Sequence, residues 1–77
     1  MNYNEFKCEL QLGREIEFAL NGKDYFISHD EIKYNIWSES EKKYIFIGRL
    51  EEVLNYKFSG GMSLEENFEK FTIKFIL

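Results

Sequence analysis

Apolar and polar residues alternate on both sides of the Asn-Gly pair in "REIEFALNGKDYFIS". Asn-Gly is the preferred sequence for a two-residue type I′ turn, because both central residues need a positive φ. A turn of this length fixes the strand register, so we expect Phe18 to pair with Tyr25 and Ile16 with Ile27. The pattern predicts a β-hairpin with these four residues on one apolar face. Three acidic residues then point to the opposite face: Glu15, Glu17 and Asp24.

A second alternating segment, "EIKYNIWSESEKKYIFIG", predicts another hairpin around the polar turn "SESEKK". Pairing about residues 40 and 41 places Trp37 opposite Tyr44, and Asn35 opposite Phe46, on the face away from the apolar one. With one residue from the first hairpin, four aromatic side chains are expected to share that outer face: Phe26, Trp37, Tyr44 and Phe46. The apolar face would form the core, from Ile16, Phe18, Leu20, Tyr25, Ile27, Ile32, Tyr34, Ile36, Ile45 and Ile47.

Helical patterns flank the two hairpins. In "NYNEFKCELQLG", Asn2 and Glu5 have the spacing of a capping box, which predicts a helix over residues 3 to 12 that ends at Gly13. A short helix is expected in "RLEEVLNY", where the apolar residues recur at helical spacing. Ser63 and Glu66 match a capping pattern and predict the start of another short helix. The final "FTIKFIL" fits either a continued helix or a strand.

The composition agrees with a small α+β domain over residues 1–77: an N-terminal helix, a four-stranded antiparallel meander, two short helices and a possible C-terminal fifth strand. Ten basic and 14 acidic residues give a formal net charge of −4, and the charges are interspersed. A binder of phosphate backbones would carry a basic stripe, so direct nucleic-acid binding is not expected. One cysteine excludes an internal disulfide, and the first ten residues do not resemble a signal peptide. A cytoplasmic protein without a membrane segment is expected.

Two segments resemble a family of short, uncharacterised bacterial proteins, mainly from Gram-positive species. They are "GREIEFALNGKDYFI" and "GGMSLEENFEKFTIKFIL", which together cover about half of the chain. Met62 stands where the family has a lysine, and residues 29 to 48 match poorly. The resemblance implies a helix over residues 63 to 70 and a strand over residues 71 to 76. It implies no activity.

The candidate chemical groups favour structural roles. "SGGMS" has the glycines of a phosphate loop but no lysine, and Glu65 and Glu66 would repel a phosphate, so a tight turn is expected. His29, Asp30 and Glu31 are adjacent in sequence and cannot converge on one metal ion from an extended chain. Cys8 is expected to be a small, partly buried helix residue. We therefore expect no catalytic, metal or cofactor-binding residues, no cofactor and no small-molecule substrate.

Two interpretations of the outer aromatic face stay open: a helix covers it, or a partner binds it through Phe26, Trp37, Tyr44 and Phe46. The expected function is a non-enzymatic protein-interaction module that binds a protein partner or itself through its sheet. The alternative is an acidic inhibitor, encoded by a phage or mobile element, that occupies the nucleic-acid channel of a host defence nuclease, as anti-CRISPR proteins do. Interspersed charges favour the first function over the second.

Overall fold

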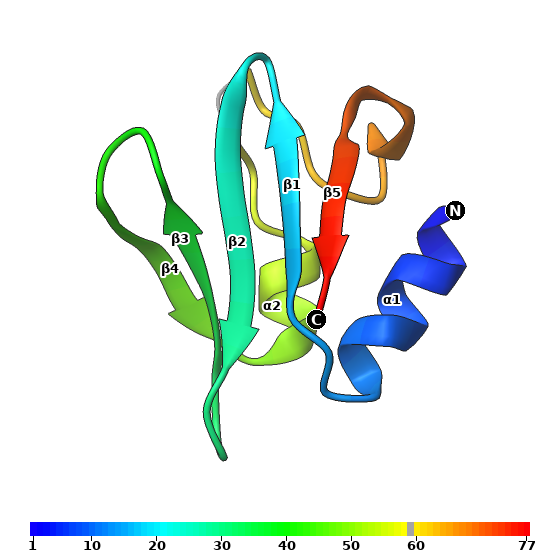
Figure 1. Cartoon of the computed structure of the whole chain (residues 1–77), viewed down its shortest axis with the longest axis vertical. Helices are drawn as coiled ribbons and strands as arrows, with labels where there is room; N and C mark the ends of the chain where they lie inside the picture. Colours follow the sequence, from blue (N-terminus) through cyan, green and yellow to red (C-terminus); the bar gives the residue numbers. More distant parts are fainter. Residues whose placement is uncertain (59) are drawn as a thin grey trace.

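The computed structural model describes residues 1–58 and 60–77. Its elements are α1 (Tyr3–Gln11), β1 (Ile16–Leu20), β2 (Lys23–His29), β3 (Tyr34–Ser38), β4 (Lys43–Gly48), α2 (Leu50–Leu54), the 3-10 turn η1 (Phe68–Lys70) and β5 (Thr72–Ile76). The strands form one antiparallel sheet in the order β4-β3-β2-β1-β5, with α2 behind it in Figure 1. The α+β class and the four-stranded meander are confirmed, and the fifth strand lies beside β1.

The first hairpin has the expected turn and register. Asn21 and Gly22 have φ values of 52° and 75°, as a type I′ turn requires. Phe18 pairs with Tyr25. Because the turn has only two residues, it leaves no freedom for the strands to slip.

The second hairpin departs from the expected register. Trp37 pairs with Tyr44 as expected, but a β-bulge follows, and Ile36 pairs with Phe46 instead of Ile45. A bulge adds one residue to one strand, so every later residue of β4 changes face. Phe46 therefore lies on the core side, and Ile47, expected in the core, is 56% exposed.

The chain between β2 and β3 is also more irregular than expected. The carboxylate of Asp30 accepts hydrogen bonds from the backbone N–H groups of Ile32 and Lys33, both at 2.8 Å. This turn keeps Ile32 out of the strand, and its side chain is 83% exposed instead of buried. β3 accordingly begins at Tyr34.

The N-terminal helix begins as its sequence predicts. The side chain of Asn2 accepts a hydrogen bond from the N–H of Glu5 at 2.8 Å, and the Glu5 carboxylate accepts one from the N–H of Asn2 at 2.9 Å. This reciprocal capping box satisfies two N–H groups that have no partner inside the helix. Phe6 and Leu10 are the buried residues of α1.

The predicted helix after Ser63 is replaced by turns. The Ser63 hydroxyl caps the N–H of Glu66 at 3.3 Å, but only the three-residue η1 follows before β5. Two aromatic contacts with core residues hold this segment: Phe68 packs on Phe6, and Phe71 packs on Phe18, with ring centroids 5.3 and 5.4 Å apart. Tertiary packing therefore overrides the local helix signal.

The buried apolar side chains form one cluster on one side of the sheet: Phe6, Leu10, Ile16, Phe18, Leu20, Tyr25, Ile27, Ile36, Val53, Leu54, Phe58, Leu64 and Phe71. Both helices contribute to this cluster, and so does the segment between α2 and β5. In the part of the chain that the structure describes, no helix is long and apolar enough to cross a membrane. The protein is thus a two-layer structure whose helices cover a single face of the sheet.

Candidate partner-binding surface

A row of side chains crosses all five strands on the face opposite the core. Backbone pairing places Phe75 of β5 beside Glu17 of β1, Glu17 beside Phe26 of β2, Phe26 beside Trp37 of β3, and Trp37 beside Tyr44 of β4. Directly opposite residues of neighbouring strands share a face, so the five side chains form one continuous line. We call this line the outer row. Four of its five members are aromatic.

The outer row is open to solvent at both ends and half-buried in the middle. Phe75 is 59% exposed and Tyr44 is 55% exposed, whereas Phe26 and Trp37 are intermediate. The exposed Ile47 extends the apolar surface along β4, next to Asn35. Single exposed apolar residues are common on protein surfaces, but large ones side by side on an open face, as in Phe26, Trp37 and Tyr44, are rare outside binding sites.

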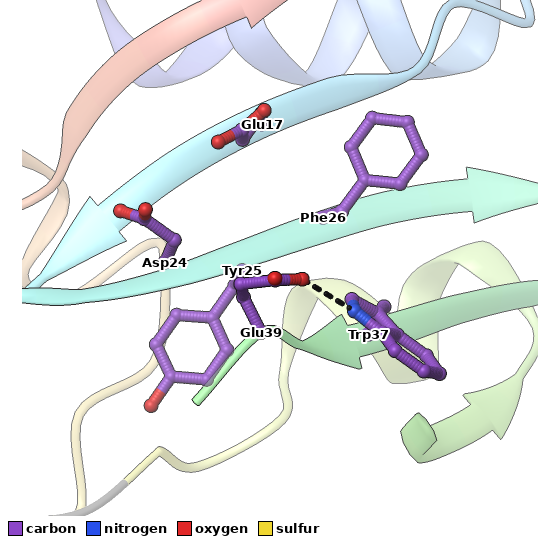
Figure 2. Close-up of a pocket in the computed structure, with 6 residues that line it drawn as sticks. All are labelled: Glu17, Asp24, Tyr25, Phe26, Trp37 and Glu39. Carbon is purple, nitrogen blue, oxygen red and sulfur yellow. Dashed lines mark hydrogen bonds between the residues drawn. The ribbon is translucent and has the colours of Figure 1, made fainter. Parts of the chain in front are cut away.

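A shallow hollow of about 540 Å³ lies on this face, drawn in Figure 2. Its lining residues are Glu17, Asp24, Tyr25, Phe26, Trp37 and Glu39. In Figure 2, the rings of Phe26 and Trp37 lie toward one end and the carboxylates of Glu17 and Asp24 toward the other. The Tyr25 ring points away from this group, in agreement with its burial in the core beside Phe18. The hollow thus has an aromatic end and an acidic end.

One lysine from β5 forms ion pairs with both carboxylates at the acidic end. The ammonium group of Lys74 lies 3.1 Å from a carboxylate oxygen of Asp24 and 3.8 Å from one of Glu17. The hydrogen bond with Asp24, followed by the negative charges of Asp24 and Glu17, raises the pKa of Lys74 above its ordinary value. A single cation therefore serves two carboxylates.

At the aromatic end, Glu39 orients the ring of Trp37. The indole N–H of Trp37 donates a hydrogen bond to the Glu39 carboxylate at 3.0 Å, drawn as the dashed line in Figure 2. The other carboxylate oxygen of Glu39 pairs with Lys42. The Lys42 hydrogen bond, and then the Trp37 bond, lower the pKa of Glu39. The Trp37 ring also meets the Tyr44 ring edge to face at 5.0 Å, so its orientation is fixed on two sides.

Three of the four residues expected to bind a partner lie together on this surface: Phe26, Trp37 and Tyr44. Phe46 does not, because the bulge in β4 turns its ring to the core side. There it packs against Tyr56, with the ring centroids 5.3 Å apart. The sequence reasoning missed Phe75 and Ile47. Strict alternation in "FTIKFIL" would place Phe75 on the same face as Ile73, and a register shift between β1 and β5 moves it to the outer face beside Glu17. No sequence signal marks the bulge that exposes Ile47.

The other chemical candidates lie outside the outer row. The two ring nitrogens of His29 lie 2.7 Å from the carbonyl oxygen of Gly13 and 3.1 Å from that of Asp30. Cys8 is exposed, not partly buried as expected. Gly60 and Gly61 have φ values of 84° and 73°, as a tight turn requires, and the N–H of Gly61 donates to the carbonyl of Phe58 at 2.9 Å. Within residues 1–58 and 60–77, no group of three His, Cys, Asp or Glu side chains could hold a metal ion.

The resemblance to a family of short Gram-positive proteins stays a prediction. Comparison of the chain with protein families, with curated proteins and with solved structures found no match.

Proposed function

We propose that the chain is a non-enzymatic protein-interaction module that binds a protein partner, or a second copy of itself, through the outer row. The observation that carries this proposal is the line of four aromatic side chains on the sheet face that the helices leave uncovered. Large aromatic residues supply much of the binding energy in protein interfaces. Large apolar patches are rarely left exposed to solvent unless a partner covers them. Their exposure here favours a binding role over a purely structural one.

The orientation of Trp37 supports the same proposal. Its hydrogen bond to Glu39 and its contact with Tyr44 hold the ring in place before any partner arrives. A side chain that is already ordered loses less conformational entropy on binding. Trp37 is therefore the residue on which we expect binding to depend most.

The alternative function, an acidic inhibitor of a nuclease, has less support. A protein that imitates nucleic acid needs a dense face of unneutralised carboxylates. Here many of the acidic side chains are paired with neighbouring cations, as in Glu9 with Arg14, Glu52 with Arg49 and Glu66 with Lys57. This distribution favours an ordinary solvated surface.

Site-specific photocrosslinking in the source cell tests the proposed function. A photoreactive amino acid at position 44 would report on the outer row, and the same group at position 12, where Leu12 is 73% exposed outside the sheet, would be the matched control. We expect a discrete crosslinked product from position 44 only. Adding Trp37→Ala should weaken that interaction by about 2 kcal/mol or more and remove the product.

Sedimentation of the purified chain over a range of concentrations separates the two kinds of partner. Self-association that Trp37→Ala abolishes would identify the partner as a second copy. Equal crosslinking from positions 12 and 44, unchanged by Trp37→Ala, in a chain that stays monomeric, would contradict the proposed function.

A further inference from the structure

The charges around the hollow indicate what kind of partner group fits it. Its lining contains three carboxylates, from Glu17, Asp24 and Glu39, and no lysine or arginine of the described residues lines it. Lys74 and Lys42 reach these carboxylates from outside the lining. Since Lys74 serves both Glu17 and Asp24, two lysines neutralise three acids and one negative charge is left over.

A partner that covered the hollow would have to neutralise this remaining negative charge or solvate it with hydrogen-bond donors. Burying a carboxylate without a cation or hydrogen-bond donors is costly, so an apolar helix laid over the hollow would meet an electrostatic penalty. A second copy of the chain, packed face to face, would bring one acidic hollow against another. A nucleic acid would bring phosphates against carboxylates. One added cation removes the penalty.

The aromatic end of the hollow indicates which cationic group fits it best. Phe26 and Trp37 are neighbours on β2 and β3 and both line the hollow, so their rings are accessible to a group that enters it. A cation above an aromatic ring is attracted by the negative face of the ring, most strongly for tryptophan. A guanidinium group is planar and can stack on a ring while its N–H edge donates to carboxylates, which an ammonium group cannot do.

We propose that the hollow receives an arginine side chain from a basic segment of the protein partner. The guanidinium stacks on Trp37 or Phe26 and donates hydrogen bonds to Asp24 and Glu17, and the rest of the outer row contacts the adjoining part of the partner. This inference rests on the proposed function and adds to it the chemistry of the partner. It assigns Glu17 and Asp24 to recognition and Trp37 to the stacking platform.

The inference is tested by titrating the chain with a short glycine peptide that carries one arginine. The amide NMR chemical shifts of the chain are monitored at low ionic strength. We expect shifts confined to the outer face, including the indole N–H of Trp37. The same peptide with citrulline, which has nearly the same shape and no charge, should bind about tenfold more weakly, a loss of about 1.4 kcal/mol. A lysine peptide should also bind more weakly than the arginine peptide.

Two double variants with the same change in net charge distinguish binding at the hollow from non-specific attraction of the peptide to an acidic protein. Glu17→Gln with Asp24→Asn removes the acidic end of the hollow. Glu31→Gln with Glu69→Gln removes two exposed carboxylates outside the strands and is the control. The first pair should weaken binding of the arginine peptide about tenfold and the second should leave it unchanged. Thermal melts of both variants verify that the fold is retained.

Several results would overturn the inference: equal loss in the two double variants, equal binding of the citrulline or lysine peptide, shifts spread over both faces, or no binding. Self-association abolished by Trp37→Ala would assign the hollow to a second copy and would also overturn it. If the peptide fails while crosslinking from position 44 still depends on Trp37, the inference is wrong and the proposed function stands. If the peptide binds the hollow and crosslinking fails, the proposed function is wrong instead.

Discussion

Gly22 shows how one residue can be required by backbone conformation alone. Its φ is 75°, and a Cβ atom added there would meet nothing within 4 Å. Any cost of a side chain at this position therefore comes from the left-handed backbone and not from a clash. Left-handed conformation costs an L-residue about 1–2 kcal/mol.

Gly22→Ala should accordingly lower the free energy of unfolding by about 1–2 kcal/mol. Chemical denaturation followed by circular dichroism measures this change. Lys23→Val, at the neighbouring exposed strand residue, is the control and should stay within about 0.5 kcal/mol of the parent. A Gly22→Ala variant as stable as the parent would contradict the type I′ turn.

His29 links the end of α1 to the corner between β2 and β3. Both of its ring nitrogens face carbonyl oxygens, which only accept hydrogen bonds, so the charged imidazolium can donate to both and the neutral ring to only one. The Gly13 carbonyl first, then that of Asp30, raises the pKa of His29, and the negative charges of Glu15 and Asp30 add to the effect while burial opposes it. The folded chain therefore holds the proton more tightly than the unfolded chain.

This raised pKa predicts a pH-dependent contribution to stability. The contribution is fully present below the unfolded pKa of about 6.5, and it is lost as the pH rises through the higher folded pKa. His29→Gln should therefore lower the melting temperature most at about pH 5.5 and least at about pH 8.5, relative to the parent at the same pH. A difference between the two proteins that stays constant with pH would contradict this role.

At the scale of elements, the bulge in β4 decides which aromatic ring is core and which is surface. Without it, Phe46 would lie on the outer face beside Asn35. With it, Phe46 packs against Tyr56, and Tyr44 stays 55% exposed beside Trp37.

A pair of alanine substitutions tests this assignment. Phe46→Ala should destabilise the fold by about 1–3 kcal/mol, less than a fully buried phenylalanine, because its ring is only partly buried. Tyr44→Ala should cost less than about 1 kcal/mol, since an exposed ring loses little on truncation. Denaturation curves in which both variants lose less than about 1 kcal/mol would indicate the regular register without a bulge, because both rings would then lie on the outer face.

The elements that sequence reasoning predicted correctly are those whose geometry is fixed locally. The two-residue turn at Asn21 and Gly22 determines its own register, and the capping box at Asn2 and Glu5 determines where α1 begins. The β3–β4 loop is longer, and an extra residue can enter either strand without changing the pattern of residue types. The C-terminal segment is decided by pairing with β1, more than 50 positions earlier along the chain, which no local pattern reports. Hence Phe26, Trp37 and Tyr44 could be placed from sequence, but Phe46, Ile47 and Phe75 could not.

At the scale of the whole molecule, the central feature is the asymmetry of the sheet. Short helices and the α2–β5 segment fill one face with aromatic and aliphatic side chains, and the other face keeps its aromatic residues with acids between them. A chain of this size has too little helix to cover both faces. The uncovered face is the basis of the proposed function and of the inferred arginine-binding hollow.

Acrylamide quenching of Trp37 fluorescence in the isolated monomer tests this asymmetry most directly, because Trp37 is the only tryptophan and lies in the middle of the outer row. A neutral quencher avoids repulsion by the neighbouring carboxylates, and the unfolded chain supplies the limit of full access. The uncovered face predicts clear quenching of the folded monomer, lower than in the unfolded chain because the ring is half-buried, together with solvent-exposed emission. Blue-shifted emission that acrylamide barely quenches would show that Trp37 belongs to a core and would contradict the account.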